Sequence, residues 1–435
     1  METSATPKSP MDGNETYTLT TSASGISIVA HDIYAVSRAL ATLSFIITEN
    51  SDEAYLPGRY SMQSVTVKDY PTYKTRALLV DTARHYLPIS TLKRQINGLA
   101  IAKMNVLHLH VIDDQSSAFA PETVPAKDFQ NAAYYTGGWY RTFMDDLREL
   151  STYAHSMGVY MMIEFDMPGH AKSWRLANEK LTANCPKHDY STVNPLNAEV
   201  TEYIQAYVND LVAAVWEPLG QTPLIHLGGD EVDTGCWEED PEVSAYMAEN
   251  GINSVGLWQQ FHQKIASLVP GLRFYWQESY ENGNNMSGAV VESWYDESAL
   301  VEAVQRGYKV FRAAGWYLDQ NQPGSSHYSF QDSWMDFYAI DPMDGVSKKY
   351  ADNVLGGEAA MWGEKVHDGN IDEFVWPRTV AIGEVLWSSP SSRAVNDDLK
   401  FRFNMAACKL QDIGIAAGPF RPSMPCPGDK SVRFD

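Results

Sequence analysis

Two acidic residues, Asp230 and Glu231, stand side by side in the segment HLGGDEVDTGCW, which covers residues 226–237. The two glycines before them end an apolar run, and Gly-Gly-Asp is typical of a turn at the surface. The two carboxyls could instead perform acid–base chemistry, because one can transfer a proton while the other stays charged. The surrounding sequence must decide between a solvated turn and a catalytic site.

Length and composition limit the classes of protein. The chain has 435 residues, 44% of them hydrophobic, which is enough for one large domain and a smaller one. The formal net charge of −22 argues against nucleic acid as a partner, since phosphates require a basic surface. We find no apolar run long enough to span a membrane and no signal-peptide core, so we expect no membrane partner. Twelve Trp and 24 Tyr could provide a surface that stacks on sugars or other rings, although most aromatic residues are simply part of the core.

Short apolar runs with a strand pattern alternate with amphipathic helical patterns through most of the chain. The eight runs begin at residues 76, 105, 159, 223, 273, 289, 308 and 353. Such alternation is typical of βα units that build a parallel sheet. Eight units over about 310 residues predict a (β/α)8 TIM barrel.

The first 70 residues predict a smaller unit of another kind. YTLTTS, GISIVA and SMQSVTVKDYP have strand patterns, and DIYAVSRALATLSFII has a helical one. We therefore expect an α/β protein in three parts. They are a small α+β domain over residues 1–70, a catalytic (β/α)8 barrel over residues 71–390, and a C-terminal helix and tail over residues 391–435 packed on the barrel.

Polar and aromatic residues follow all eight predicted strands. They are Asp81 and Arg84, Asp113 and Asp114, Glu164, Asp166 and His170, Asp230 and Glu231, Trp276 and Glu278, Trp294, Trp316, Tyr317 and Asp319, and Trp362 and Glu364. The carboxyl ends of the strands surround the active site of a TIM barrel, so these side chains should converge. One such residue would most often be structural. Their occurrence at every strand end predicts a pocket for a ring with many hydroxyls.

Seven motifs at these strand ends resemble those of the family 20 glycoside hydrolases, the β-N-acetylhexosaminidases. The motifs are DTARHYLP, NVLHLHVIDDQ, EFDMPGHAKSW, HLGGDEVDTGCW, FYWQE, GWYLD and GGEAAMWGE, in this order. The resemblance runs from about residue 73 to 426. Residues 16–50 resemble only the end of the family's N-terminal α+β domain, so we expect that domain to be truncated. The resemblance implies a retaining exo-enzyme that removes terminal non-reducing GlcNAc or GalNAc from glycoconjugates or chitooligosaccharides.

The implied mechanism accounts for the adjacency of the acid pair. Ordinary retaining glycosidases need two carboxyls about 5–5.5 Å apart on opposite sides of the bond, which neighbours on one strand end cannot provide. In the substrate-assisted route the acetamido oxygen of the sugar attacks C1 and gives an oxazolinium. Glu231 is then the general acid and base, and Asp230 holds and polarises the acetamido N–H. We also expect the two acids to raise each other's proton affinity.

Four further polar residues take roles from the resemblance. Arg84 binds the C3 and C4 hydroxyls of the sugar, although an isolated Arg could equally form an ion pair at the barrel rim. Tyr317 donates its hydroxyl to the acetamido carbonyl oxygen. Asp113 and His170 form a relay that holds the charge and orientation of Glu231, with a satisfied core histidine as the alternative for His170.

Three tryptophans and two acids complete the implied pocket. Trp276, Trp294 and Trp362 form its apolar walls, although any one Trp alone is more often part of a core. Asp319 and Glu364 accept hydrogen bonds from the C4 and C6 hydroxyls. Family members that accept sulfated sugars have a basic residue after WYL, where this chain has Asp-Gln. We therefore expect neutral terminal sugars as the substrates.

The four cysteines are Cys185, Cys236, Cys408 and Cys426, and their spacing lacks the C-x-x-C pattern of zinc or thioredoxin-like motifs. Their number is consistent with two disulfides. In the family pattern Cys185 and Cys236 bridge neighbouring loops beside the active site. The same pattern lets Cys408 and Cys426 tie the last helix to the tail.

Asn14 and Asn285 each begin an N-glycosylation sequon, a short pattern that also occurs by chance. Together with the cysteines they favour the secretory route, so we expect a secreted or lysosomal glycoprotein. Terminal N-acetylhexosamine glycans are the expected ligands. The resemblance also implies a homodimer formed through the outer helices of the barrel.

Two other classes of protein remain open. His108 and His110 lie near carboxylates and could belong to a metal-dependent hydrolase. We find no further His at the later strand ends, however, and this pair follows the second strand rather than the first. A sugar-binding protein without catalysis would keep the pocket and lose turnover. We expect neither a metal nor a cofactor.

Overall fold

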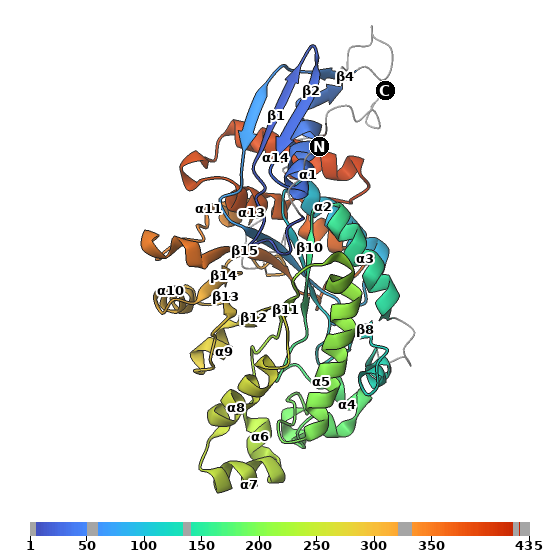
Figure 1. Ribbon diagram of the computed structural model, residues 1–435, viewed down its shortest axis with the longest axis vertical. Helices are drawn as coiled ribbons and strands as arrows, with labels where there is room; N and C mark the ends of the chain where they lie inside the picture. The colour runs from blue at the N-terminus through green and yellow to red at the C-terminus, as the bar shows by residue number, and fades with distance from the viewer. Residues whose placement is uncertain (1–5, 50–59, 134–140, 321–332, 421–425, 427–435) are drawn as a thin grey trace.

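The computed structural model describes residues 6–49, 60–133, 141–320, 333–420 and 426. Eight parallel strands close into a barrel in the order β10-β11-β12-β13-β14-β15-β6-β7 (Figure 1). They are β6 (Thr75–Asp81), β7 (Val106–His110), β10 (Tyr160–Glu164), β11 (Leu224–His226), β12 (Leu272–Trp276), β13 (Ala289–Ser293), β14 (Lys309–Arg312) and β15 (Val354–Met361). All eight predicted runs are barrel strands, so the predicted TIM barrel is confirmed.

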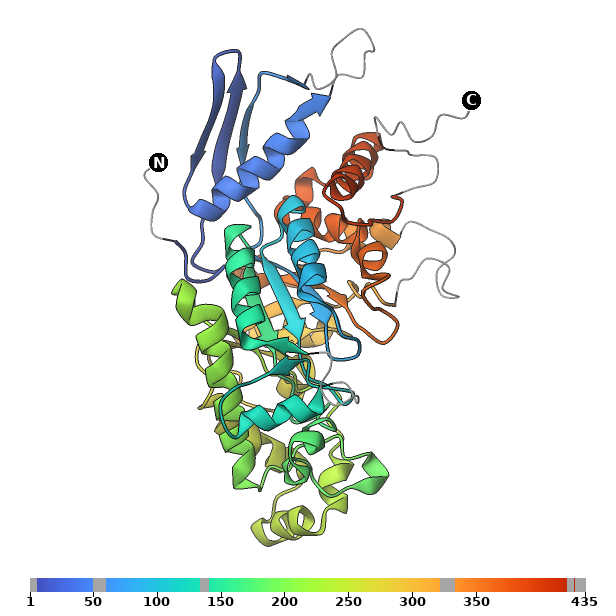
Figure 2. The same cartoon turned by 90° about the vertical axis from the view of Figure 1, so that its right-hand side faces the viewer.

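Helices cover the outside of the barrel (Figures 1 and 2). The longer ones are α2 (Ile89–Ile101), α3 (Met144–Ser156), α5 (Ala198–Leu211), α8 (Ser254–Ala266), α10 (Glu297–Gln305) and α13 (Arg378–Trp387). Their apolar residues recur at helical spacing, as in α2, where Leu92, Ile96 and Leu99 are fully buried. These side chains and the outward-facing residues of the strands form the main hydrophobic core.

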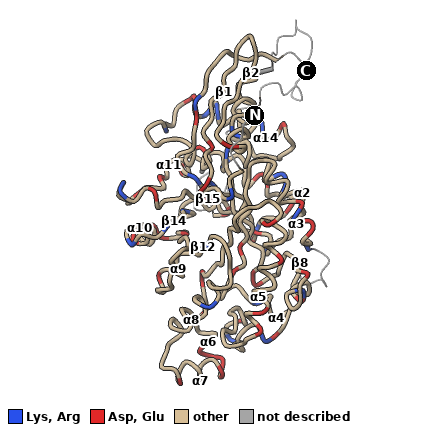
Figure 3. The backbone as a smooth tube through the Cα atoms, viewed as in Figure 1, with Lys and Arg blue, Asp and Glu red and all other residues tan. Residues whose placement is uncertain are grey.

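Shorter elements lie in the loops between the strands and the outer helices. They are β8 (Phe119–Ala120), β9 (Thr142–Phe143), α4 (Trp174–Ala177), α6 (Gly235–Glu239), α7 (Pro241–Asn250), α9 (Gln277–Glu281), α11 (Ser333–Ala339) and α12 (Ile371–Val375). Helices α4, α6 and α7 gather at the end of the barrel away from the N-terminal sheet (Figure 1). Acidic residues are distributed over the described parts of the chain, including this end (Figure 3).

The inside of the barrel changes from apolar to charged along its axis. Apolar side chains, among them Val106, Met162 and Phe274, fill the end where the strands begin. Side chains two positions apart on a strand point to the same face. Two positions further along four of the strands, this face carries His108, Glu164, His226 and Glu292, all fully buried.

The N-terminal part contains a three-stranded antiparallel sheet and a helix. Strand β1 (Tyr17–Ser22) lies between β2 (Gly25–Ala30) and β5 (Thr66–Asp69). Helix α1 (Ile33–Ile46) packs against this sheet (Figure 2). A second ribbon pairs β3 (Ile47–Glu49) with β4 (Tyr60–Met62). These strands and this helix match the predicted pattern, and the division of the whole chain into three domains stays a prediction.

A buried ion cluster joins the N-terminal part to the barrel. The carboxylate of Glu15 lies 2.7 Å from Nε of Arg38 on α1 and 2.6 Å from Nη2 of Arg76 on β6. The side chain of Asn105 donates to the same carboxylate at 3.1 Å. Burial raises the pKa of Glu15, but the two guanidinium groups outweigh it and leave that pKa lowered. The cluster therefore fastens the small sheet to the starts of the barrel strands.

At the other end of the chain, α14 (Asp397–Asp412) packs beside α2 and α13. A disulfide joins Cys408 in this helix to Cys426. Through the described stretches of the chain, no helix combines the length and apolarity that crossing a membrane requires.

Candidate active site

The acid pair lies on a tight turn after β11. Gly228 and Gly229 have φ angles of +60° and +86°, which side-chain-bearing residues rarely adopt. A Cβ on Gly228 would lie 1.5 Å from Oδ1 of Asp166, and one on Gly229 would lie 2.2 Å from Oγ of Ser279. The N–H of Gly229 donates to Oδ1 of Asp166 at 3.0 Å. The two glycines therefore let the turn pass close to the neighbouring strand ends.

A histidine connects the two acids to a third carboxylate. Nε2 of His170 lies 3.5 Å from Oδ2 of Asp230 and 3.6 Å from Oε2 of Glu231. Nδ1 of the same ring lies 3.4 Å from Oδ1 of Asp113. Both His170 and Glu231 have left-handed backbone, with φ of +51° and +47°, and such strain clusters at functional sites. The structure thus brings the four predicted acid–base residues together.

Arg84 is tied to the same group of side chains. Its Nη2 lies 2.7 Å from Oδ2 of Asp113, which also pairs with Nε2 of His110 at 2.8 Å. Its Nη1 lies 2.9 Å from Oδ2 of Asp81 and 3.5 Å from Oε1 of Glu364. The ion pairs that we named as the alternative role of Arg84 are therefore present. Its side chain also keeps 11% of its surface exposed.

The protonation of this group follows from its partners. Burial lowers the pKa of His170, but the carboxylates of Asp230 and Asp113 outweigh it and raise that pKa well above its usual value. Hydrogen bonding from His170 then lowers the pKa of Glu231, whose side chain is 62% exposed. We expected the neighbouring acid to raise the proton affinity of Glu231. That expectation is wrong, because the Glu231 carboxylate faces an imidazolium.

The predicted aromatic walls form one cluster at this end of the barrel. Trp276, Trp362 and Tyr317 are buried in it, and Trp294 packs against it from a more exposed position. The ring centroids of Trp276 and Trp362 lie 6.0 Å apart, and those of Trp294 and Tyr317 also lie 6.0 Å apart with nearly parallel planes. Trp316 is different, because it belongs to the main core, where its indole N–H donates to a backbone carbonyl.

Several carboxylates at this end of the barrel have a buried oxygen without a hydrogen-bond partner among the described residues, and Asp166, Asp230 and Asp319 are three of them. Burial and the charge of Glu364 raise the pKa of Asp319 to about 6. Among the described residues, nothing donates a hydrogen bond to Oδ1 of Asp319 or to Oδ1 of Asp230. An unsatisfied buried acceptor costs about 1–3 kcal/mol unless water or a ligand fills it. These two oxygens therefore mark positions where the N–H or O–H groups of a ligand can bind.

Sequence reasoning gave Gln277 no part in the site and Glu278 only a place at the rim. The indole N–H of Trp294 donates to both carboxylate oxygens of Glu278, at 3.1 and 3.0 Å. Oε1 of the fully buried Gln277 accepts from the backbone N–H of Trp294 at 2.9 Å. Burial and the charge of Asp230 raise the pKa of Glu278 to about 7. The signal was a Gln-Glu pair directly after a strand, which alone names no partner.

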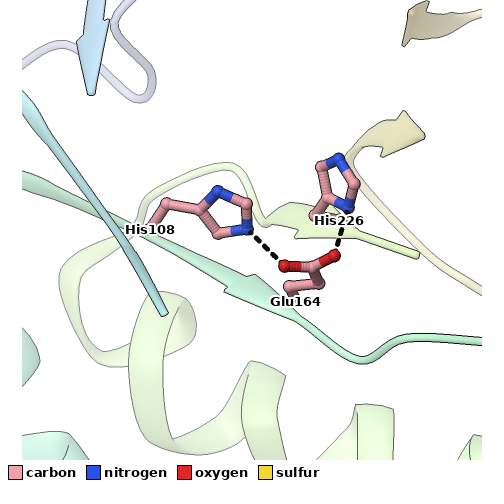
Figure 4. Close-up of side chains that lie close together, drawn as sticks. All are labelled: His108, Glu164 and His226. Carbon is pink, nitrogen blue, oxygen red and sulfur yellow. Dashed lines mark ion pairs between the residues drawn. The ribbon is translucent and has the colours of Figure 1, made fainter. Parts of the chain in front are cut away.

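A layer of buried ion pairs lies beneath the pocket. Figure 4 shows Glu164 between His108 and His226, with its oxygens 3.3 Å from Nε2 of the first and 3.2 Å from Nδ1 of the second. Glu164 also accepts a hydrogen bond from the indole N–H of Trp276 at 2.8 Å. Burial raises the pKa of Glu164, but His110 and His226 outweigh it and hold that pKa well below its usual value. The layer thereby supports one wall of the pocket from below.

The same layer of buried side chains tests whether the protein could be a metal-dependent hydrolase. We expected no further histidine near His108 and His110, and that expectation is wrong, because His226 of β11 lies in contact with Glu164. These side chains are fully buried and pair with one another, as Nδ1 of His108 does with Glu358 at 3.0 Å. A catalytic metal site keeps one position open to water or substrate. The closed arrangement of this layer does not fit such a site.

Both predicted disulfides are present. Cys185, in the loop after β10, is joined to Cys236 in α6, and both residues are fully buried. Since Cys236 follows the acid pair by a few residues, this bridge holds the segment that carries it. Asn14 and Asn285, the predicted glycosylation sites, both have exposed side chains.

Comparison with known proteins identifies a matching family model and similar proteins. The model described as glycosyl hydrolase family 20, catalytic domain, matches residues 73–390. The β-hexosaminidase subunit A1 of Dictyostelium discoideum is 33% identical over 428 residues, which cover 97% of this chain and 78% of that protein. The human β-hexosaminidase subunit beta is 30% identical over 425 residues, which cover 94% of this chain and 72% of that protein.

Solved structures share the fold. A family 20 exo-β-N-acetylglucosaminidase of Vibrio harveyi, in complex with N-acetylglucosamine, superposes with a TM-score of 0.81 at 21% identity, over 95% of this chain and 68% of that one. A chitobiase of Flavobacterium johnsoniae superposes with a TM-score of 0.78 at 25% identity, over 92% of this chain and 60% of that one. The chain therefore belongs to glycosyl hydrolase family 20, the β-N-acetylhexosaminidases.

Proposed function

We propose that this hydrolase is a retaining exo-enzyme that releases a terminal non-reducing GlcNAc or GalNAc by substrate-assisted catalysis. One observation carries the proposal. The buried, unpartnered Oδ1 of Asp230 can accept the acetamido N–H of a sugar, while the adjacent Glu231 is exposed and in contact with His170. The site thus offers an orienting carboxylate and a proton donor in neighbouring positions, and the sugar supplies the nucleophile.

In the first step the acetamido oxygen forms a bond to C1, and the bond from C1 to the leaving oxygen breaks. Glu231 transfers a proton to that oxygen, so the leaving group departs as a neutral alcohol. Positive charge develops on the ring formed by C1 and the acetamido group. The carboxylate of Asp230 accepts the acetamido N–H and stabilises this charge, and the Tyr317 hydroxyl orients the acetamido oxygen.

In the second step water attacks C1 from the side that the leaving group occupied. Glu231, now a carboxylate, takes the proton of this water while the bond from C1 to the acetamido oxygen breaks. Two inversions at C1 give net retention of the β configuration. The contact of His170 with Glu231, and of Asp113 with His170, supports a relay that holds the charge of Glu231 between the two steps.

The remaining site residues are proposed to bind the sugar. Arg84 is held by carboxylates on one side and lies over the ring of Trp362, with its guanidinium carbon 5.1 Å from the ring centroid. It is proposed to donate to the C3 and C4 hydroxyls. Asp319 and Glu364 accept from the C4 and C6 hydroxyls, and the indoles of Trp276, Trp294 and Trp362 form the apolar walls.

The substrate is proposed to be neutral. Asp319 and Glu364 are both acids at the end of the site assigned to C6, and the residue directly after Asp319 is Gln320 rather than a basic residue. Lys365 and Arg378 offset part of the effect of Glu364 on Asp319, whose pKa is nevertheless raised. A 6-sulfate would meet these two carboxyls and be repelled. We expect the neutral aryl glycoside to be hydrolysed at least about tenfold faster than its 6-sulfated form, a difference of about 1.4 kcal/mol. Equal rates for the two substrates would contradict this part of the proposal.

The experiment that tests the mechanism is hydrolysis of a nitrophenyl β-N-acetylglucosaminide followed by proton NMR. We expect the β anomer of GlcNAc to appear first and to mutarotate later. Glu231→Gln should lower kcat by at least about 10³-fold, because Gln cannot transfer the proton. First appearance of the α anomer would overturn the substrate-assisted route. An inactive parent that still binds GlcNAc would indicate a sugar-binding protein.

Three wider properties complete the proposal. The two disulfides and the two exposed sequons support a secreted or lysosomal glycoprotein. Relatives named as subunits support a homodimer, which light scattering would detect. Limited proteolysis would test the three-part division at residues 70 and 390, since cleavage at domain boundaries leaves each folded part intact.

A further inference from the structure

Two consecutive side chains at the end of β12 hold the loop that follows β13. Gln277 is fully buried, and its Oε1 accepts the backbone N–H groups of Trp294, Tyr295 and Asp296 at 2.9, 3.3 and 3.4 Å. Its Nε2 donates to Glu281 at 2.9 Å. A single side-chain oxygen thereby fixes three successive backbone positions of the neighbouring loop.

Glu278 acts on the side chain that this loop carries. The indole N–H of Trp294 points between its two oxygens, at 3.1 and 3.0 Å. The ring of Trp294 also packs against that of Tyr317, with centroids 6.0 Å apart and an interplanar angle of 29°. The hydrogen bonds to Glu278 and this ring contact together restrict the orientation of the Trp294 indole in the free protein.

The short helix that carries Glu278 also contacts the acid turn. The hydroxyl of Ser279, the next residue, donates to the carbonyl oxygen of Gly229 at 3.5 Å. Burial is the largest cause that raises the pKa of Glu278 to about 7, and the charge of Asp230 is the next. The residues that follow β12 therefore hold Trp294 through Glu278 and contact the turn of the acid pair through Ser279. The backbone of this turn needs support, since Glu231 has a left-handed φ of +47°.

Resting on the proposed function, we propose that Glu278 is a positioning residue, which holds the Trp294 wall and the Asp230–Glu231 turn in a fixed relation to each other. The acetamido group must fit between the Tyr317–Trp294 side and Asp230 for its oxygen to reach C1. Misplacement by about 1 Å can cost about 10²-fold in rate. Glu278 acts through these neighbours, so its loss should affect the transition state more than sugar binding.

The test compares Glu278→Gln and Glu278→Ala with a matched control, Glu302→Gln. Glu302 lies on α10, which follows the same loop, and forms an exposed ion pair with Arg306. We expect Glu278→Ala to lower kcat by about 10- to 100-fold with KM changed less than about threefold. Glu278→Gln should recover part of kcat, since its carbonyl oxygen can still accept the indole N–H. Glu302→Gln should match the parent.

A double mutant shows whether Glu278 works through Trp294. Trp294→Phe keeps a ring in the wall and removes the N–H that Glu278 binds. If the two residues act together, combining Glu278→Gln with Trp294→Phe should lower kcat less than the product of the two single effects. Multiplicative losses would overturn this link. If the Ala variant does not fold, the near-isosteric Gln variant and this double mutant still decide the question.

A second readout separates positioning from simple loss of structure. A stable thiazoline analogue of the cyclic intermediate should bind Glu278→Ala more weakly by about the same factor as kcat/KM falls, while GlcNAc binding stays within about threefold. Equal weakening of both ligands, or an unchanged kcat, would overturn the proposal and leave the proposed function standing. Release of the α anomer by the parent would instead overturn the proposed function, whatever Glu278 does.

Discussion

Nε2 of His170 lies 3.6 Å from Oε2 of Glu231, and the two residues face each other from left-handed backbone positions on different loops. The pKa of His170 is raised well above its usual value and that of Glu231 is lowered, so the pair holds its proton on the imidazole. Such a pair titrates as a unit. Glu231 is therefore ionised at lower pH than a lone glutamic acid, and it must take up a proton before it can transfer one to the leaving oxygen.

His170→Asn should shift the alkaline limit of activity to higher pH. In the parent, hydrogen bonding from the His170 imidazolium lowers the pKa of Glu231, so this general acid loses its proton below its ordinary value. In the variant the imidazolium is gone, and the pKa of Glu231 should return towards 4.5. We expect kcat/KM of both enzymes to fall about tenfold per pH unit on the alkaline limb, with the limb of the variant beginning at higher pH.

The matched control for this change is His188→Asn. His188 pairs with Asp233 at 2.8 Å in the neighbouring loops, but it contacts neither acid of the pair. Its pH profile should coincide with that of the parent. If His170→Asn also keeps the parent's profile, the imidazolium of His170 does not set the pKa of Glu231.

Asp230→Asn should lower kcat by about 10²- to 10³-fold with a smaller effect on KM. The amide keeps the shape of the side chain and loses the charge that stabilises the developing cation. Asp233→Asn, in the same loop, serves as the control and should stay within about twofold of the parent. Steady-state kinetics with an aryl GlcNAc glycoside measures both. A loss confined to KM would mean that Asp230 binds the sugar without stabilising the transition state.

Gly229→Ala should reduce both stability and activity. The backbone there has a φ of +86°, and an added Cβ would lie 2.2 Å from Oγ of Ser279. Gly220→Ala is the control, because Gly220 also has a left-handed φ, of +62°, but has no atom within 4 Å of the added Cβ. We expect the first variant to lose about 1–3 kcal/mol more than the second in urea unfolding. Equal losses would mean that only the backbone conformation matters.

Glu15→Gln should destabilise the whole chain. The change leaves two buried guanidinium groups, Arg38 and Arg76, without their counter-charge, and breaking a buried pair costs about 3–5 kcal/mol. Glu302→Gln removes an exposed pair with Arg306 and should cost less than about 1 kcal/mol. Thermal or urea unfolding compares the two variants. Similar losses would show that the Glu15 cluster contributes little.

The pKa of Glu15 also gives this cluster a pH dependence. The folded pKa lies below the ordinary 4.5, so the unfolded chain binds the proton first as the pH falls. The contribution of Glu15 is therefore complete above pH 4.5 and is lost below it, as the pH falls towards the folded pKa. The difference in unfolding free energy between parent and Glu15→Gln should shrink over that range. A difference that stays constant down to full protonation would contradict this account.

Replacing Cys185 and Cys236 by Ser should affect activity more than replacing the other cysteine pair. The first bridge closes a separation of 51 residues and the second one of 18, which predicts losses of about 4 and about 3 kcal/mol from chain entropy alone. The first bridge also fastens the segment after the acid pair. We expect kcat to fall at temperatures at which the variant is still folded. The variant that lacks Cys408 and Cys426 should keep kcat below its melting temperature.

The barrel and most of the candidate site were predictable from the sequence because both depend on local patterns. Strand and helix periodicities are repeated eight times, and in a closed parallel barrel every strand ends on the same side. The positions of residues such as Arg84, Asp230 and Trp362 then follow from where each strand stops. The aromatic cluster and the contacts of His170 agree with that placement.

Only the tertiary structure decided which side chains, distant in the chain, contact one another and shift one another's pKa values. The Glu231 carboxylate lies 3.6 Å from Nε2 of His170, and this contact reverses the expected direction of its pKa shift. After burial, the charge of Asp230 is the next cause that raises the pKa of Asp166 and of Glu278, which follow other strands. Electrostatic interactions depend on distance and burial in space. The two adjacent acids in the sequence therefore indicated a site, and the tertiary structure determined which acids of that site have raised or lowered pKa values.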